Sequence, residues 1–176
     1  LALGFRLDDY PRPDSIGPDR LADAAAAAWR HGVPVATVDC GTATVVNIVD
    51  AQGVFVGGLI LPGAPLFLDY LAERTARLPA LRWRAVSRRP GRTGRGTDEA
   101  MRWGAVIGFE GMVRAAVDHA RQVMGQGNGL VCLTGGYASR VAGRLGPGVR
   151  LTPDLTLMGL WHIHVLNPLP GGPDHV

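Results

Sequence analysis

The chain alternates between short apolar runs and longer segments whose apolar positions recur every three or four residues. Runs rich in Val, Ile and Leu are typical of strands, whereas the longer spacing is typical of helices. The expected strands are residues 1–7, 34–39, 44–49, 54–61, 129–133 and 149–151. The expected helices are residues 19–30, 64–77, 98–124, a segment from 137 to about 145, and 154–163. Residues 50–53 are expected to form a hairpin turn.

This order predicts an α/β fold in which a three-stranded meander is followed by alternating helices and strands. A proline-rich loop at residues 8–18 precedes the first helix, and an arginine-rich loop occupies residues 79–96. Thr97 is expected to be the N-cap of the long helix, with Asp98 and Glu99 in its first turn. Residues 167–176 are rich in proline and glycine, and we expect a flexible tail.

Composition narrows the class of protein. Hydrophobic residues make up 47% and charged residues 19% of the 176 positions. No apolar run reaches the ~18 residues that a membrane helix needs, and no secretory signal is visible. Cys40 and Cys132 each lie in an apolar run without metal-ligand spacing, which favours buried free thiols in a reducing compartment over a disulfide. We therefore expect a soluble, cytoplasmic protein.

All 18 basic residues are arginine, so a Walker-type phosphate loop, which requires lysine, is excluded. Six arginines cluster in or beside the loop, at positions 82, 84, 88, 89, 92 and 95. The net charge is only +3 and Trp83 is the main aromatic residue among them, which favours a solvated or nucleotide-adjacent loop over a nucleic-acid surface. His162 and His164, with Asp174 and His175, lack the fixed spacing of a metal site.

The segment from Val38 to Thr44 carries the most informative chemistry. One carboxylate (Asp39), one glycine (Gly41) and two hydroxyls (Thr42 and Thr44) stand between two strand-like runs. A tight turn would gather these groups and successive backbone N–H donors around one point, which suits phosphate and a cation. The alternative is a hairpin whose polar residues satisfy only the turn itself.

Six motifs together resemble the type III pantothenate kinase family, whose domains are ribonuclease-H-like and belong to the actin-like ATPase superfamily. Tyr10, Pro13, Gly17, Asp19 and Arg20 resemble its Y-x-x-P-x-x-x-G-x-D-R run, and residues 39–44 its D-x-G-T-A-T. Residues 57–63 resemble G-G-x-I-x-P-G, and Gly96-Thr97 with Glu99-Ala100 resemble the G-x-T-x-E-A run. Thr134-Gly135-Gly136 and Pro153-Asp154-Leu155 complete the series in order, so the resemblance extends from Leu1 to about Ile163.

The resemblance implies phosphorylation of pantothenate by ATP with Mg²⁺ and a monovalent cation, K⁺ or NH₄⁺, in the first step of coenzyme A biosynthesis. Its implied site residues are Asp19 as general base; Tyr10, Gly17, Pro18, Arg20 and Thr97 at the substrate; Gly41, Thr42, Gly135 and Gly136 at the nucleotide; and Asp39 at the monovalent cation. From the residues alone, a helix-terminal carboxylate is the favoured interpretation of Asp19, and Arg20 could be a solvated helix arginine. Tyr10 could be a loop aromatic packed on the core, and the two glycines could serve only a strand-to-helix turn.

The family's first motif, D-x-G-N-T, grips the ATP phosphates and is absent from these 176 residues. The chain therefore resembles the second half of such a kinase. Residues 1–30 would be the end of a preceding domain and a linking helix that carries the substrate loop, and residues 31–166 the ribonuclease-H-like domain. We expect a homo- or hetero-oligomer in which the missing loop comes from a lost segment or a partner subunit, and no activity of the chain alone. The alternatives are an inactive regulatory or scaffolding homologue and a nucleic-acid-associated factor.

Overall fold

The computed structural model describes residues 1–8, 10–83, 93–125 and 129–168. Its centre is a five-stranded mixed sheet in the order β3-β2-β1-β4-β5. The strands are β1 (Val35–Cys40), β2 (Ala43–Val49), β3 (Phe55–Pro62), β4 (Leu130–Thr134) and β5 (Val149–Leu151). Neighbouring strands from β3 to β1 are antiparallel, whereas β4 runs parallel to β1 and β5 parallel to β4. The expected α/β class is confirmed, and the sheet is consistent with an actin-like ATPase fold.

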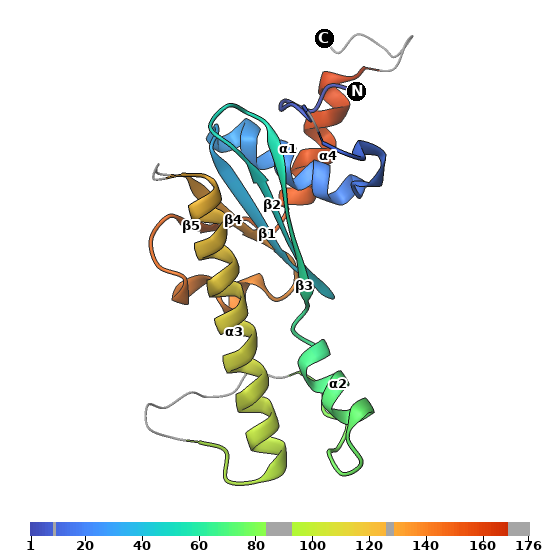
Figure 1. The fold of residues 1–176 in the computed structure, drawn as a ribbon, viewed down its shortest axis with the longest axis vertical. Coiled ribbons are helices and arrows are strands. Elements are labelled where there is room, and N and C mark those ends of the chain that lie inside the picture. The colour runs from blue at the N-terminus through green and yellow to red at the C-terminus, as the bar shows by residue number, and fades with distance from the viewer. Residues whose placement is uncertain (9, 84–92, 126–128, 169–176) are drawn as a thin grey trace.

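Helices cover both faces of this sheet (Figure 1). Within the described residues the α-helices are α1 (Pro18–His31), α2 (Leu66–Arg74), α3 (Thr97–Val123) and α4 (Leu155–Leu166). Helices α1 and α4 pack together on one face, and the carboxyl-terminal half of α3 packs on the other. Helix α2 and the start of α3 project beyond the sheet, where Leu68, Met101 and Ala105 form a small core of their own.

Alternation along β1 assigns its side chains to these two layers. Ala36, Val38 and Cys40 are buried in the core beneath α3, whereas Val35 packs in the core beneath α1 and α4. Because successive side chains of a strand point to opposite faces, Asp39 lies on the α1 side. Asp39, near the end of β1, therefore faces the helix that carries Asp19.

Close packing of α1 against α4 depends on small residues. The alanine run of α1 is buried, and Gly159 of α4 lies so near the backbone of Ala22 that a Cβ atom at position 159 would overlap the Ala22 carbonyl. Small residues on both helices allow their backbones to approach closely. The expected helix at residues 19–30 is thus confirmed.

The expected strand at residues 1–7 is wrong. Only one isolated bridge joins this segment to the sheet, between Arg6 and Val54. Gly4 has a positive φ of 80°, which interrupts an extended conformation. The segment instead lies along the end of α4, where the Ala2 backbone and the Asn167 side chain exchange two hydrogen bonds of 2.7 and 2.8 Å.

Three expected helices differ in length or type. The segment from 137 to 145 forms two short 3₁₀ helices, Ala138–Arg140 and Ala142–Arg144, in a stretch that also contains Gly143. Helix α4 does not end before His164, because its apolar pattern continues to Leu166 and Asn167 follows as its C-cap. Helix α2 ends at Arg74, where the Thr75 hydroxyl donates to the Leu71 carbonyl.

Within the part of the chain that the structure describes, no helix is long and apolar enough to cross a membrane. Cys40 and Cys132 are both buried free thiols, as the sequence predicts. Burial raises the pKa of Cys40 to about 12 and that of Cys132 to about 11, so both stay protonated at neutral pH.

Candidate active site

Two parallel strands end side by side at the centre of the sheet. Asp39 of β1 pairs in register with Thr134 of β4. Gly135 follows with a positive φ of 89°, and a Cβ atom there would collide with Asp39 Oδ1 and the Cys40 backbone. The Tyr137 backbone N–H donates to the Cys40 carbonyl over 3.0 Å. Asp39 and Gly135 are therefore in contact, and only glycine fits at position 135.

Gly41 and Thr42 form the turn that joins β1 to β2 beside Asp39. The Gly41 N–H donates to the Ala43 carbonyl over 3.0 Å, and the Gly63 N–H donates to the Thr42 carbonyl over 3.1 Å. A Cβ atom at Gly63 would overlap the carbonyl oxygens of both turn residues, so the turn is held tightly against this glycine. The packing fixes the backbone of the turn and leaves Thr42 exposed to solvent.

The Thr44 hydroxyl does not join this group. It is buried and donates to the Pro62 carbonyl over 3.1 Å, which links β2 to the end of β3. The expectation that both threonine hydroxyls surround one ligand site is wrong for Thr44, because its position in the sheet points it to the neighbouring strand.

Asp19 lies in the first turn of α1 and is exposed to solvent. Gly17 is the N-cap of this helix, and no side chain in the described part of the chain caps it. Pro18 occupies the first helical position, where its missing N–H costs nothing. A Cβ atom at Gly17 would lie 2.5 Å from Asp19 Oδ1, so a larger residue would displace the carboxylate. The motif residues Gly17 and Pro18 thus place Asp19 at the helix end.

Arg20 is anchored to the sheet. Its Nε donates to Asn47 Oδ1 over 2.8 Å, and its guanidinium carbon lies 5.7 Å from the centre of the Phe55 ring. Asn47 is itself buried and donates to the Thr37 hydroxyl over 3.1 Å. The alternative of a solvated helix arginine is therefore wrong, because a chain of hydrogen bonds across β1 and β2 fixes Arg20.

Tyr10 approaches the same aromatic ring from the loop before α1. Its ring centre lies 5.7 Å from that of Phe55, and Gly57 lies beside it, where an added Cβ atom would be in ordinary contact with Tyr10 Cε2 at 3.7 Å. Tyr10 is half-buried, which agrees with the interpretation of a loop aromatic packed on the core. Tyr10 and Arg20 together flank Phe55 close to the start of α1.

Three carboxylates lie close enough to affect one another. Burial and the charge of Asp19 raise the pKa of Asp39. Burial, with smaller contributions from the charges of Asp39 and Asp19, raises the pKa of Asp23 to about 7, although the Thr156 hydroxyl donates to it over 2.6 Å and partly opposes the shift. The site therefore concentrates negative charge and would be stabilised by a cation.

The side chains around Asp39 determine which kind of cation could bind there. The described residues contain no group of three His, Cys, Asp or Glu side chains that could hold a metal ion. Asp39 is a half-buried carboxylate near the end of β1. A single carboxylate suits a cation of low charge better than a divalent ion that needs several acidic ligands.

Thr97 lies away from this group. It is the exposed first residue of α3, with Gly96 as N-cap, so the expected N-cap role of Thr97 is wrong. Phe109 packs beneath the end of β1, and Thr97 lies 12 residues earlier, about 18 Å further along the helix axis. Helix α1 is on the opposite face of the sheet (Figure 1), so one chain does not bring Thr97 to Asp19.

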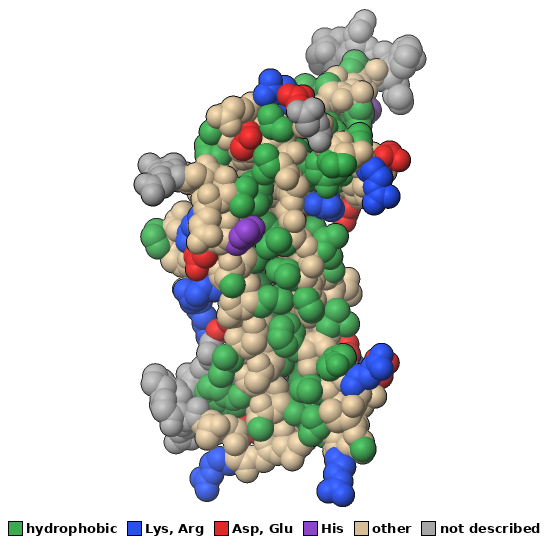
Figure 2. Space-filling model, viewed as in Figure 1, with side chains coloured by type: hydrophobic (Ala, Val, Ile, Leu, Met, Phe, Trp, Pro, Cys, Tyr) green, Lys and Arg blue, Asp and Glu red, His purple; other side chains and the backbone are tan. Residues whose placement is uncertain are grey.

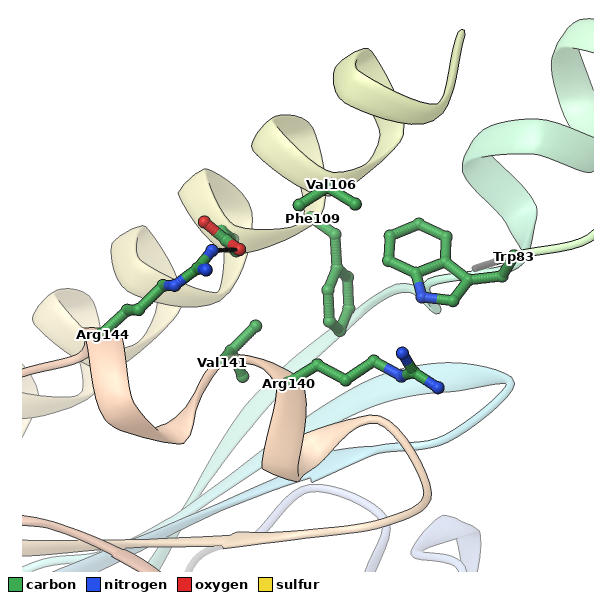
Figure 3. Close-up of a pocket in the computed structure, with 7 residues that line it drawn as sticks. Trp83, Val106, Phe109, Arg140, Val141 and Arg144 are labelled. Atoms are coloured by element: carbon green, nitrogen blue, oxygen red, sulfur yellow. Dashed lines mark hydrogen bonds and ion pairs between the residues drawn. The ribbon is translucent and has the colours of Figure 1, made fainter. Parts of the chain in front are cut away.

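A cavity of about 120 Å³ lies between α3 and the two 3₁₀ helices that follow Gly136. It is lined by Trp83, Val106, Phe109, Glu110, Arg140, Val141 and Arg144 (Figure 3). Trp83 packs edge-on against Phe109 with ring centres 5.7 Å apart, and its buried Nε1 has no hydrogen-bond partner among the described residues. Arg144 is ion-paired with Glu110, and Arg140 extends beneath Trp83.

These aromatic faces, guanidinium groups and an unused N–H donor suit a planar heteroaromatic ring. Gly136 is exposed, and a Cβ atom there would meet nothing, so a ligand can approach the chain between the cavity and Asp39. Of the six clustered arginines, those at 84, 88, 89 and 92 lie outside the described residues, and the Arg82 carbonyl accepts a hydrogen bond from Arg102.

Sequence reasoning missed three residues of the site. Asn47 stands inside an otherwise apolar strand run, and Asp23 precedes an uninterrupted run of alanines, so each is a lone polar residue at a position where burial was expected. A polar residue at a position expected to be buried is a signal that the sequence offers, because buried polar side chains need hydrogen-bond partners. Phe55 gave no signal, since an aromatic residue in a strand is ordinary.

The sequence profile of the type III pantothenate kinase family matches residues 2–119. The chain belongs to this family. A type III pantothenate kinase from Akkermansia muciniphila is 39% identical over 158 residues, which is 90% of this chain and 63% of that protein. One from Methylacidiphilum infernorum is 38% identical over 152 residues, or 86% of this chain and 55% of that protein.

The chain thus spans only 55–63% of the length of these two relatives. A solved structure of a Campylobacter jejuni protein, assigned to the Baf family of transcriptional activators, superposes on 94% of the chain with a TM-score of 0.63. It covers 70% of that protein at 19% sequence identity, which shows a shared fold.

Proposed function

We propose that this chain is the part of a type III pantothenate kinase that binds pantothenate and the nucleotide, and that the assembled enzyme phosphorylates pantothenate with ATP to give 4′-phosphopantothenate. The observation that carries the proposal is the meeting of Asp19, Asp39 and Gly135 at the ends of α1, β1 and β4. Family membership supplies the reaction, and this arrangement supplies groups suited to it.

Each group has a defined task in this proposal. Asp19 accepts the proton of the primary alcohol as its oxygen attacks the γ-phosphorus, and ADP leaves. Arg20, held by Asn47, attracts the substrate carboxylate, and Tyr10, Gly17 and Pro18 shape the pocket around it. Such phosphoryl transfer depends on positioning and electrostatics, which the fixed Arg20 and the constrained start of α1 provide.

The nucleotide occupies the other side of Asp39 in this proposal. Gly41 and Thr42 face its phosphates, Gly135 and Gly136 face the ribose, and the cavity of Figure 3 receives the base between Trp83 and Arg140. Mg²⁺ on the phosphates and K⁺ or NH₄⁺ at Asp39 would offset the charge that accumulates during transfer. Reduced thiols at Cys40 and Cys132 agree with a cytoplasmic location, which stays a prediction.

The D-x-G-N-T loop is not among these 176 residues, so the proposed reaction requires that loop from polypeptide outside them. The test combines this chain with an amino-terminal segment of a family member that carries D-x-G-N-T, and measures ADP release with ATP, Mg²⁺, K⁺ and pantothenate. Asp19→Asn should lower turnover by roughly 10²–10⁴-fold while ATP affinity barely changes. Asp14→Asn, in the exposed loop before α1, is the matched control and should have no effect.

Near-normal turnover of Asp19→Asn at saturating pantothenate would refute the base role. No turnover of the reconstituted wild type would instead favour the inactive regulatory or scaffolding homologue. Robust turnover by the chain alone would show that the missing loop is not required. A steep salt dependence of RNA or DNA binding would revive the nucleic-acid hypothesis.

We also propose that the working enzyme is a dimer that pairs through α2 and α3. A groove of about 550 Å³ between these helices is lined mainly by apolar residues, among them Leu66, Phe67 and Tyr70, and Tyr70 is 63% exposed. Apolar side chains gather along this seam (Figure 2). A second copy would also bring a Thr97 near a substrate pocket that its own chain cannot reach.

Sedimentation of the reconstituted enzyme tests the dimer, with Tyr70→Glu expected to shift it toward the unpaired form. Thr97→Ala should raise KM for pantothenate only in the paired form. A wild-type enzyme that sediments unpaired at micromolar concentration with full activity would contradict this part of the proposal.

A further inference from the structure

Two buried polar side chains stand opposite each other in the middle of the sheet. Thr37 of β1 and Asn47 of β2 pair in register, and each is only 1% exposed. Asn47 Nδ2 donates to the Thr37 hydroxyl over 3.1 Å, and Asn47 Oδ1 accepts from Arg20 Nε over 2.8 Å. Burying polar groups costs free energy unless they are hydrogen-bonded. What this pair holds in place is Arg20.

The chemistry of the amide decides which of its atoms meets Arg20. An arginine side chain only donates, so it requires the amide oxygen, and the amide nitrogen is left to face Thr37. Because both ends of the Asn47 amide are occupied, the amide cannot rotate without losing a hydrogen bond inside the sheet. The Phe55 ring supports the guanidinium as well, with its centre 5.7 Å from Arg20 Cζ. Arg20 is therefore held at one nitrogen and against one ring.

Most of the guanidinium remains free. It carries five N–H donors, and Asn47 uses only the one on Nε. Among the described residues no carboxylate forms an ion pair with Arg20, although Asp19 precedes it directly in α1 and Asp23 follows three residues later. The terminal nitrogens of this half-buried side chain thus keep their donors and the positive charge. A planar fork of this kind binds a carboxylate through two parallel hydrogen bonds.

Resting on the proposed function, we propose that Asn47 is a positioning residue that gives the enzyme its selectivity for an acidic substrate. Asn47 holds Arg20 at Nε, so the substrate carboxylate binds end-on to the two terminal nitrogens, and Asn47 itself does not touch the substrate. Anchoring Arg20 to the sheet also keeps it from pairing with Asp19, which stays available to the substrate alcohol. The enzyme should therefore prefer pantothenate to the neutral analogue in which a hydroxymethyl group replaces the carboxylate.

The first test uses the reconstituted enzyme described above. Asn47→Leu keeps a similar volume but removes the acceptor for Arg20 Nε. It should raise KM for pantothenate at least about tenfold, while kcat and KM for ATP change less than about threefold, because only substrate binding is lost. The preference for pantothenate over the neutral analogue, measured as the ratio of their kcat/KM values, should fall by the same factor. A general loss of structure would instead affect both substrates alike.

Three further substitutions separate positioning from folding. Asn47→Asp keeps an acceptor for Arg20, and the Thr37 hydroxyl can donate to it, so most of the selectivity should return. Thr37→Val leaves Asn47 in place without its second partner and should raise KM for pantothenate by a smaller factor of about three. Thr44→Val is the matched control, because it removes another buried hydrogen bond of 3.1 Å from the same strand, and it should leave both KM values unchanged.

A second test needs neither catalysis nor a change at Asn47. In ¹⁵N NMR of the 176-residue chain, the Arg20 Nε–H signal is assigned by its loss in Arg20→Lys. This proton should exchange with water at least about tenfold more slowly than that of the exposed Arg12, because Asn47 holds it. Added pantothenate should shift the signals of the terminal nitrogens of Arg20 and leave the Nε–H protected.

Equal KM values for the wild type and Asn47→Leu would overturn the proposal, as would a loss that the neutral analogue shares in full. Rapid exchange of the Arg20 Nε–H in the wild type would overturn it too. An enzyme without turnover whose pantothenate binding still weakens tenfold in Asn47→Leu would refute the proposed reaction and leave the positioning role standing. Absence of pantothenate binding by the wild type at millimolar concentration would overturn both.

Discussion

Replacing Asp23 by asparagine should remove a pH-dependent loss of stability that originates between α1 and α4. Asp23 is only 2% exposed, and its carboxyl group accepts a hydrogen bond of 2.6 Å from Thr156 on α4. Burial, together with the nearby charges of Asp39 and Asp19, raises its pKa from 3.8 to about 7. The folded protein therefore holds a proton on Asp23 that the unfolded chain releases at much lower pH.

This difference in pKa sets the direction and the magnitude of the change in stability with pH. Between pH 3.8 and about 7 the native state binds more protons at Asp23 than the unfolded state, so the free energy of unfolding falls as pH rises. Each pKa unit corresponds to about 1.4 kcal/mol, and a shift of about three units gives a loss of about 4 kcal/mol across the window. The contribution is complete below pH 3.8 and is lost above pH 7.

Urea unfolding of the 176-residue chain at pH values from 4 to 8.5 measures this effect. Relative to Asp23→Asn, the wild type should lose stability steadily up to pH 7 and then level off. Asp14→Asn, on the exposed loop, is the control and should follow the wild-type curve. Thr156→Val should carry the decline to higher pH, because the hydrogen bond from Thr156 lowers the pKa of Asp23 and its loss raises that pKa further.

Parallel curves for the wild type and Asp23→Asn across this range would refute the reasoning. They would show that Asp23 titrates alike in the folded and unfolded states, and so that burial between α1 and α4 does not control its proton. A direct check is the pH dependence of the Asp23 carboxyl carbon signal in NMR, which should change near pH 7.

Other substitutions probe the backbone and the thiols. Gly135→Ala should lower the free energy of unfolding by about 1–3 kcal/mol, because φ is positive there and the added Cβ would collide with Asp39 Oδ1. At Gly136 an added Cβ meets open space, so Gly136→Ala should change the free energy of unfolding little in the same urea titration. Gly159→Ala should lower the free energy of unfolding by about 1–3 kcal/mol, because its Cβ overlaps α1. Gly111→Ala in α3 has room for a Cβ and should raise the free energy of unfolding by up to about 1 kcal/mol. Equal effects of the two substitutions would contradict the packing argument. The Cys40 thiol, with its pKa raised to about 12, should react with a disulfide reagent at pH 7 only after unfolding in urea, and fast labelling of the folded chain would count against its burial.

Several elements were predictable because their signals are local. The apolar runs at Val35–Cys40 and Ala43–Val49 needed only a tight turn between them to pair, and Gly41 and Thr42 supply it. The length of α3 and its acidic first turn can be read from its own residues. The helix ends within one residue of Met124, where the sequence predicts its end. The family motifs are local too, which is why the family could be named before any contact was known.

Where local signals were weak, neighbours decided the structure. Residues 1–7 are apolar enough for a strand, but Gly4 and the hydrogen bonds to Asn167 hold them along α4. The segment at residues 137–145 forms 3₁₀ turns instead of an α-helix. The arrangement of the carboxylates also depended on the fold, since a raised pKa at Asp39 requires α1 to cover one face of β1.

The sequence by itself determined the family, the sheet-forming runs and the residue types at the site, because composition, spacing and turn chemistry act over a few positions. Tertiary structure alone decided that Arg20 is fixed by Asn47, that Asp23 is buried beneath α4, and that Thr97 lies about 18 Å along α3 from the core beneath β1. These facts depend on contacts between residues far apart in the chain, whose distances are set only when the helices pack on the sheet.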